Sequence, residues 1–147
     1  MKIQTKAYGE IEVDARQKIV FPSGLLGFER LRDFVLMDSH QQPFYWLQSM
    51  EIVEVAFVMI DPLIFRTDYL VDPSPEELED IEFQEGDELL VFSILTIPAE
   101  QRKMTANLQG PVVINKRNRL GKQLILNDER WLVRHHVFEE LARTRAC

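Results

Sequence analysis

The residues that could bind a metal ion are few and do not form a ligand set. His135 and His136 are adjacent, and neighbouring side chains of an extended strand point to opposite faces, so the pair cannot chelate one ion. His40 stands alone in a polar segment, and the single cysteine, Cys147, is the last residue. No Cys or His spacing matches a zinc site. We therefore expect surface histidines, no metal and no cofactor.

Nucleophilic catalysis and phosphate binding also lack their usual motifs. No serine lies in a Gly-x-Ser-x-Gly elbow. Gly24 and Gly27 are not followed by the Gly-Lys-Ser/Thr ending of a phosphate loop. The sequence thus predicts that the protein is not an enzyme. One alternative stays open, a hydrolytic or small-molecule-binding β-barrel that uses buried carboxylates, and an inward-facing pair of acids in a deep pocket would favour it.

A run of acidic residues offers three interpretations. Segment 72–88 holds nine acids and no base. It lacks the Asp-x-Asp-x-Asp-Gly pattern of a calcium loop, and acid–base catalysis needs burial to separate the pKa values of paired carboxylates. A solvated face is the simplest interpretation, and a negative patch directed at a partner is the alternative. Its candidate contacts are Glu76, Glu79, Glu82 and Glu85.

The charge of the chain is uneven. Its net charge of −7 argues against a nucleic-acid binder, which needs a concentrated positive surface. From residue 116 to the end, however, eight Lys or Arg outnumber four acids. The acidic and basic segments either attract each other within the fold or face different partners.

Residues 43–49, Pro-Phe-Tyr-Trp-Leu-Gln-Ser, form an aromatic motif. On a strand, Phe44, Trp46 and Gln48 share one face. Core packing closed by a hydrogen bond from Gln48 is the favoured interpretation. A binding platform is the alternative, because Trp and Tyr concentrate in interface hot spots.

A second polar motif lies at residues 105–115. Asn107 and Gln109 precede Gly110-Pro111, and proline interrupts a central strand because it donates no ladder hydrogen bond. We expect a bulge here, with its backbone groups satisfied by these amides.

Apolar patterning predicts the elements that hold these motifs. Strands are expected over 10–14, 18–21, 34–37, 44–48, 55–60, 89–97, 112–115 and 123–127. Between them, Gly24 and Gly27 supply the positive φ angles of a tight turn. The capping sequence at 74–77 predicts a short helix ending near residue 81, and 137–145 predicts a second. Strands at intervals of roughly 8–12 residues with little helix indicate a mainly β protein, a compact antiparallel β-barrel-like single domain over residues 1–147.

Composition bounds the remaining classes. The 147 residues are 46% apolar and 28% charged, as in ordinary globular proteins. The N-terminus lacks the apolar stretch of a signal peptide. The longest apolar run, 55–60, is far shorter than the roughly 20 residues of a membrane span. We expect a cytoplasmic monomer with no membrane contact.

Taken in order, these segments resemble the flagellar assembly factor FliW family. The resemblance rests on Phe21-Pro22-x-Gly24-Leu25-x-Gly27-Phe28-Glu29, Pro43-Phe44-x-Trp46-Leu47-Gln48-Ser49, Asp61-Pro62, Thr105-x-Asn107-Leu108, Pro111-Val112-Val113-Ile114-Asn115 and Gly121-x-Gln123-x-Ile125-Leu126. It covers about residues 2–134 and leaves the tail 135–147 uncovered. Leu26, Gly110 and Trp131 depart from the residues usual in the family.

The resemblance implies a compact β fold, no catalysis and two protein partners. Family members bind newly made flagellin in the cytoplasm and also bind CsrA, a small RNA-binding repressor of flagellin translation. Export of flagellin frees the assembly factor to sequester CsrA. We expect the face of Phe44 and Trp46 to bind the apolar stripe of flagellin, and the acidic run to lie beside the RNA site of CsrA, with no direct nucleic-acid contact.

Overall fold

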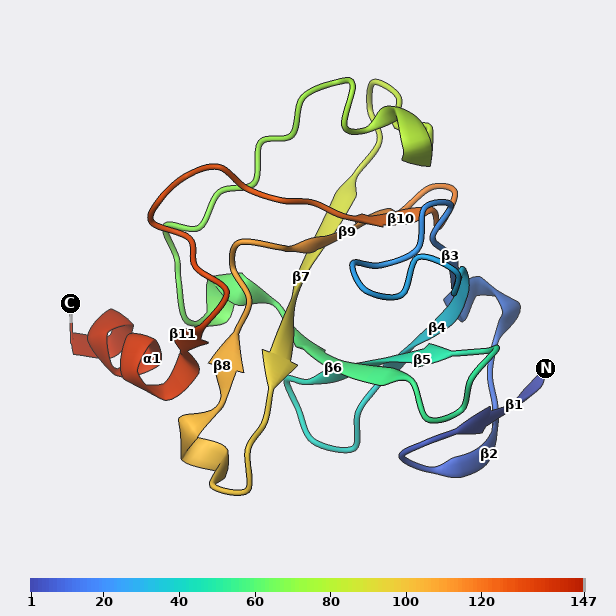
Figure 1. Cartoon of the computed structure of the whole chain (residues 1–147), viewed down its shortest axis with the longest axis horizontal. Helices are drawn as coiled ribbons and strands as arrows, with labels where there is room; N and C mark the ends of the chain where they lie inside the picture. The colour runs from blue at the N-terminus through green and yellow to red at the C-terminus, as the bar shows by residue number, and fades with distance from the viewer. Residues whose placement is uncertain (147) are drawn as a thin grey trace.

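Antiparallel strands make up most of the regular structure in the computed structural model, which describes residues 1–146 (Figure 1). The strands are β1 (Lys2–Thr5), β2 (Gly9–Glu12), β3 (Lys18–Val20), β4 (Asp33–Asp38), β5 (Tyr45–Ser49), β6 (Ala56–Ile60), β7 (Leu89–Thr96), β8 (Thr105–Ala106), β9 (Val112–Asn115), β10 (Gly121–Gln123) and β11 (His135–His136). One α-helix, α1 (Val137–Ala146), ends the described chain. Four 3-10 turns complete the structure: η1 (Ala15–Gln17), η2 (Pro62–Ile64), η3 (Glu79–Ile81) and η4 (Gln101–Lys103).

The main sheet curls on itself without closing. Its strand order is β10-β9-β7-β6-β5-β4-β3, with β8 joined to β7 and to β11. The two ends of this order approach each other, because the N–H of Val20 donates to the carbonyl of Arg119 at 3.1 Å beside a bridge to Leu120. Strands β1 and β2 form a separate hairpin. The predicted mainly β, barrel-like fold is therefore confirmed.

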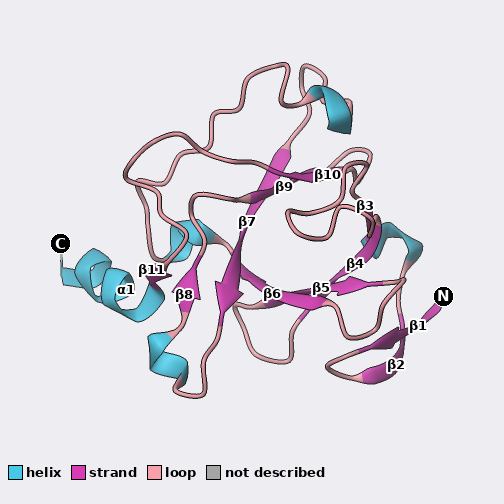
Figure 2. Ribbon diagram, viewed as in Figure 1, coloured by secondary structure: helices cyan, strands magenta, loops and turns pink. Residues whose placement is uncertain are grey.

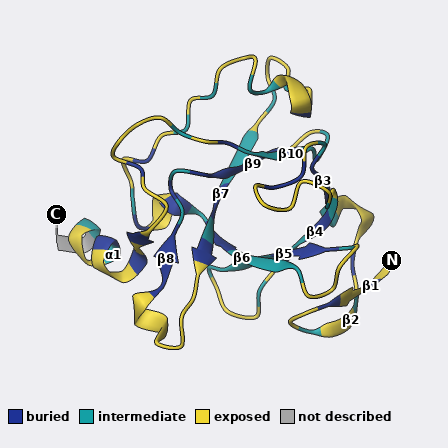
Figure 3. Cartoon of the chain, in the orientation of Figure 1, coloured by how far each residue is buried: buried dark blue, intermediate teal, exposed yellow. Residues whose placement is uncertain are grey.

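Alternation of apolar side chains fills the inside of the curl. Phe21, Phe34, Leu47 and Met59 come from the loop after β3 and from β4, β5 and β6, and all are fully buried. Phe21 and Phe34 meet edge to face, with ring centroids 5.3 Å apart. Figure 3 shows this buried centre and the exposed loops around it. A second core, around Trp131 and Leu108, lies between β8 and the segments that precede η3 and α1.

Most predicted strands are confirmed, but the one expected at 123–127 is wrong. Strand β10 is Gly121–Gln123 instead. The following residues bond to the bulge: the N–H of Leu124 donates to the carbonyl of Pro111 at 2.9 Å, and that of Leu126 donates to the carbonyl of Gln109 at 2.8 Å. Since Pro111 has no N–H, the regular ladder cannot continue past it.

The helix predicted at 74–81 is also wrong, although its capping pair forms. The N–H of Glu77 donates to Oγ of Ser74 at 3.3 Å. From Leu78 to Glu82 the chain then makes bonds from residue i to i−3, including Glu79 to Glu76 and Ile81 to Leu78, so it forms turns and η3. Figure 2 shows this single short coil in the segment. The helix expected at 137–145 is confirmed as α1.

Candidate functional site

An open apolar hollow lies beside the aromatic motif. Its volume is about 310 Å³. It is lined by Tyr8, Ser39, His40, Gln41, Phe44, Trp46, Val58, Ile97, Gln101 and Met104. Phe44 and Trp46 are half-buried, so they are neither core residues nor fully exposed. Both interpretations of the motif hold in part: one side of each ring packs against the protein, and the other side lines the hollow and is open to solvent.

Tyr8, from the hairpin of β1 and β2, forms the polar side of this hollow. Its hydroxyl accepts a hydrogen bond from Nε1 of Trp46 at 3.1 Å and another from the N–H of His40 at 2.9 Å. The Tyr8 and His40 rings stack with centroids 3.9 Å apart. Both polar atoms of the wall are thus satisfied, and the surface that faces solvent is mainly apolar. Sequence patterning gave no sign of Tyr8, because it lies 38 residues from Trp46.

Gln48 shares the strand face of Trp46 but is not part of the hollow. It is 1% exposed. Its Oε1 accepts from the N–H of Lys6 at 2.9 Å, and its Nε2 donates to the carbonyls of Ser49 and Val53, both at 2.9 Å. Its burial agrees with the favoured interpretation, core packing closed by Gln48 hydrogen bonds, and leaves no exposed amide for a partner, since the amide holds the N-terminal hairpin to the sheet.

The four candidate acids of the acidic run are exposed. Glu76, Glu79, Glu82 and Glu85 lie on the segment around η3. Among residues 1–146, their carboxylates make no ion pair or hydrogen bond to a side chain. In Figure 1 this segment forms the top of the molecule, whereas η4, next to the aromatic hollow, lies at the bottom. The acidic segment and the aromatic hollow therefore lie at opposite ends of the molecule.

The rest of the acidic run is partly neutralised by the basic segment that begins at residue 116. Ion pairs join Asp80 to Lys122 at 3.2 Å, Asp87 to Arg117 at 2.8 Å and Glu88 to Lys116 at 3.4 Å. Three acids of the run are thus paired within the fold. Attraction between the two charged segments, one of the two alternatives, is what the fold contains.

Asp87 is the most constrained of these acids. The Arg117 guanidinium beside it, together with the backbone N–H of Gln84, lowers the pKa of the Asp87 carboxyl below its usual range. Asp87 also accepts from Nδ2 of Asn115 at 3.1 Å, and the same nitrogen donates to the carbonyl of Ile81 at 3.1 Å. Asn115, which belongs to one of the motifs that carry the family resemblance, is thus fully buried and anchors the acidic segment.

Other motif residues meet around the turn after β3. Gly24 and Gly27 have φ of 68° and 86°, as the turn prediction required. Oε1 of Gln123 accepts from the N–H of Leu26 at 3.0 Å, while its Nε2 donates to the carbonyl of Gly110 at 2.9 Å. Gln123 therefore ties the glycine turn to the bulge at 107–111, where two of the quoted motifs come together in space.

The remaining motif residues are structural as well. Oδ1 of Asn107 accepts from the N–H of Gly110 at 2.9 Å, as predicted for the bulge before Pro111, but the Gly110 carbonyl is bound by Gln123 and not by the Gln109 amide. Phe28 packs edge to face on Phe57, with centroids 5.3 Å apart. Asp61 caps η2, whose first residue is Pro62, by accepting from the N–H of Leu63.

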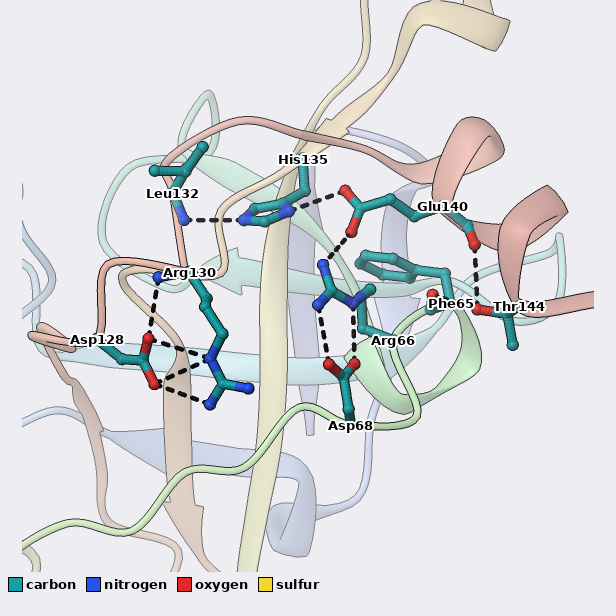
Figure 4. Close-up of polar contacts among 9 residues, drawn as sticks. All are labelled: Phe65, Arg66, Asp68, Asp128, Arg130, Leu132, His135, Glu140 and Thr144. Carbon is teal, nitrogen blue, oxygen red and sulfur yellow. Dashed lines mark hydrogen bonds and ion pairs between the residues drawn. The ribbon is translucent and has the colours of Figure 1, made fainter. Parts of the chain in front are cut away.

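A buried polar cluster docks α1, and sequence reasoning missed it (Figure 4). Glu140 binds Arg66 Nη1 through Oε1 at 2.7 Å, and its Oε2 lies 2.8 Å from Nδ1 of His135. Nε2 of His135 accepts from the N–H of Leu132 at 2.8 Å, so Nδ1 carries the proton and donates to Glu140. Arg66 also pairs with Asp68, whose carboxyl pKa is lowered by the guanidinium.

The cluster corrects the expectation of surface histidines. His136 and His40 are exposed, but His135 is 7% exposed and belongs to the core beside Trp131. Among residues 1–146, no group of three His, Cys, Asp or Glu side chains could hold a metal ion. Glu140 is the only buried Asp or Glu in the described chain. Its two carboxylate oxygens are bound by Arg66 and His135. It is therefore not half of an inward-facing acid pair.

Membrane insertion by a helix has no candidate segment. Over the described residues, no helix combines the length and the apolar character needed to cross a bilayer.

Comparison with known proteins identifies the family. The family model described as FliW protein matches residues 2–137. The chain is 43% identical over 141 residues to the flagellar assembly factor FliW of Treponema denticola, covering 96% of each chain. It is 40% identical to that of Treponema pallidum, covering 99% and 97%. A crystal structure of the flagellar assembly factor FliW superposes with a TM-score of 0.86 at 35% identity, covering 94% of this chain and 97% of that one. The resemblance is confirmed, and the chain belongs to the FliW family.

Proposed function

We propose that this protein is a cytoplasmic flagellar assembly factor that binds flagellin and antagonises the translational repressor CsrA. The observation that carries the flagellin half is the aromatic hollow between Tyr8, Phe44 and Trp46. The relatives reported above are named flagellar assembly factors, and the two partners are this proposal's own step beyond those names.

The hollow has the properties that an amphipathic segment requires. The termini of flagellin are amphipathic and disordered before assembly, so they need a surface that covers an apolar stripe. Ile97, at the edge of the hollow, is 41% exposed, which leaves apolar area for a partner to bury. Trp46 combines a large apolar ring with a satisfied N–H, the usual composition of an interface hot spot.

A binding measurement tests the flagellin half. Trp46→Ala should weaken the affinity for purified monomeric flagellin by about 30-fold or more, the effect of losing an interface hot spot of about 2 kcal/mol. Phe138→Ala is the matched control, because Phe138 is also an aromatic residue, 44% exposed, but lies on α1. Its affinity should stay within about twofold of the unsubstituted protein.

A second variant keeps the test valid if Trp46→Ala loses the fold. Ile97→Asp places a charge in the hollow at an exposed position and should weaken flagellin binding without melting the domain. Unchanged affinity in both variants would contradict this assignment of the flagellin site.

The CsrA half of the proposal rests on the exposed carboxylates of Glu76, Glu79, Glu82 and Glu85. A repressor that holds RNA needs a basic surface. Acids docked beside that surface repel phosphate over a range of about 8 Å at physiological salt. Separation of these acids from the aromatic hollow supports two partner surfaces on one domain.

A further inference from the structure

Strand β7 lacks a partner along part of one edge. On one side it pairs with β9 over Leu89–Phe92 and then with β8. On the other side, β6 pairs only with Ser93 and Ile94, past the midpoint of β7. The first half of the strand therefore has a hydrogen-bonded strand on one side only.

The Asp61-Pro62 motif explains why β6 stops. Ile60 lies opposite Ser93, so a continued antiparallel register would place Pro62 opposite Val91. Pro62 has no N–H to donate, and Asp61 instead caps the turn η2. The chain leaves the sheet at this point, and the edge of β7 stays open.

Two backbone hydrogen bonds to β7 and the residue before it show which of its N–H and C=O groups point away from β9. The N–H of Lys116 donates to the carbonyl of Glu88, and the N–H of Asn107 donates to the carbonyl of Ile94, both at 3.0 Å. Both donors lie on the β8–β9 side. Because successive residues of a strand direct their backbone groups to alternate edges, even-numbered residues of β7 face β9.

Leu89 and Val91 consequently direct their N–H and C=O groups to the open edge. Within residues 1–146, no hydrogen bond outside the strand ladders reaches the N–H or C=O of Leu89 or Val91. No strand pairs with these two residues along the open edge either. Water alone can satisfy them in the free protein. An unpaired edge of this kind is a template for another strand.

An apolar hollow of about 440 Å³ opens beside the same edge. Its lining includes all four consecutive residues Leu89–Phe92, whose side chains alternate between the two faces, so the hollow lies at the edge and not over one face. Leu63 and Leu70, 50% and 71% exposed, form its outer wall, and the Tyr45 ring lies against Phe92.

We propose that an extended peptide segment of a partner protein adds to β7 at Leu89–Val91 as an extra strand. The free N–H and C=O groups match an extended backbone, whereas a helix bonds its own backbone internally. The hollow takes apolar side chains at alternate positions. Asp61 in the lining and the exposed Asp72 beside Val71 favour a segment that also carries Lys or Arg.

This site is separate from the aromatic hollow and does not depend on the partners proposed above. The two hollows share no lining residue. A second folded copy of this chain is a poorer occupant, because it would bring a second net charge of −7 and its own acids to an edge already lined by Asp61. Pairing between copies is nevertheless one measurable outcome.

Amide hydrogen exchange of the full chain tests the open edge first. The amides of Leu89 and Val91 should exchange at least about 100-fold faster than those of Leu90 and Phe92, because an amide without a hydrogen bond lacks protection even within a strand. Equal protection of all four amides would overturn the proposal.

Selection from a displayed library of random heptapeptides tests the occupant. Peptides that alternate apolar residues and carry Lys or Arg should be enriched on the full chain and should slow exchange at Leu89 and Val91. Methylation of alternate backbone nitrogens, which removes peptide donors, should weaken binding at least tenfold. Leu70→Asp should abolish enrichment, while Leu132→Asp, a change at a residue 56% exposed elsewhere, should not.

Three results would overturn the inference. One is that no peptide is enriched more strongly on the unsubstituted chain than on the Leu70→Asp variant. Another is that the enriched peptides bind equally well after backbone methylation. The third is a concentration-dependent dimer that protects the amides of Leu89 and Val91, which would assign the edge to a second copy of the chain.

Discussion

The hydroxyl of Tyr8 accepts a hydrogen bond from Nε1 of Trp46 across 3.1 Å and joins the N-terminal hairpin to strand β5. The same oxygen accepts from the N–H of His40. One hydroxyl thus holds two walls of the aromatic hollow together, although the hairpin pairs with no strand of the main sheet.

Tyr8→Phe should lower the free energy of unfolding by about 1 kcal/mol, because it removes this hydrogen-bond acceptor and leaves Nε1 of Trp46 unpaired. Urea unfolding followed by the fluorescence of the two tryptophans measures the change. Tyr45→Phe is the matched control, since the Tyr45 hydroxyl makes no hydrogen bond within the described residues and its ring packs on Phe92. Equal losses in the two variants would show that the Tyr8 hydroxyl is not a special contact.

Reversal of the four exposed acids to lysine should weaken antagonism of CsrA and flatten its dependence on salt. The physical reason is that the repulsion of RNA phosphate is lost when the patch becomes positive. Competition between CsrA, its RNA and the variant at two salt concentrations measures both effects. The changed residues are Glu76, Glu79, Glu82 and Glu85.

A matched variant separates the patch from net charge. Reversing Asp38, Glu10, Glu54 and Glu129, which are exposed elsewhere, changes the net charge equally. If both variants lose antagonism to the same degree, overall charge and not the patch is responsible.

Glu140→Ala should destabilise the docking of α1 by about 3 kcal/mol, because it leaves the Arg66 guanidinium and the His135 N–H without their shared acceptor. Hydrogen exchange should show faster opening of α1 than of β4 or β5. Glu139→Ala, at the exposed neighbouring position, should leave this exchange unchanged. Uniform protection across α1 and the sheet in Glu140→Ala would contradict the docking role.

Stability should fall in acid through Asp87. The pKa of this carboxyl is lowered in the folded protein by Arg117, so its contribution is present above the unfolded value of about 3.9 and is lost as the pH falls through the lower folded value. Asp87→Asn should therefore destabilise the protein near pH 7 and approach the unsubstituted stability in strong acid. Glu85→Gln, an exposed neighbour, should show no such convergence because it costs little at pH 7.

Gly24→Ala should cost more stability than Gly9→Ala, although both glycines have a φ of 68°. Strain in the left-handed region accounts for roughly 1–2 kcal/mol at either position. At Gly24 an added Cβ would also lie 2.5 Å from Cα of Glu29, whereas at Gly9 nothing lies within 4 Å. Thermal unfolding of the two variants measures the difference, and equal midpoints would contradict the close approach.

Local patterning predicted most of the fold because strand formation depends on the alternation of neighbouring residues. The apolar runs at β6 and β7 and the glycine turn after β3 are confirmed. The helix expected at 74–81 failed although its Ser74–Glu77 cap formed. Ile81 is drawn into the core beside Val113 and Leu124, and this tertiary contact, with Glu82 in the left-handed region, replaces a helix with η3.

The candidate sites depended on contacts that no local pattern contains. Alternation placed Trp46 and Gln48 on one strand face, but it could not tell that the N-terminal hairpin covers Gln48 and leaves Trp46 at a hollow. Likewise, the exposed acids of segment 72–88 were visible as a run, while their neighbours Asp80 and Asp87 are paired by bases about 30–40 residues away.

The sequence by itself determined the β class, the main strands, the glycine turn and the family, because each depends on residue types at fixed local spacing. Only the tertiary structure decided which polar groups are paired. Arg66, His135 and Glu140 meet from segments about 70 residues apart, and the open edge of β7 exists because β6 turns away at Pro62. A hydrogen bond is satisfied by a partner in space, whatever its place in the chain.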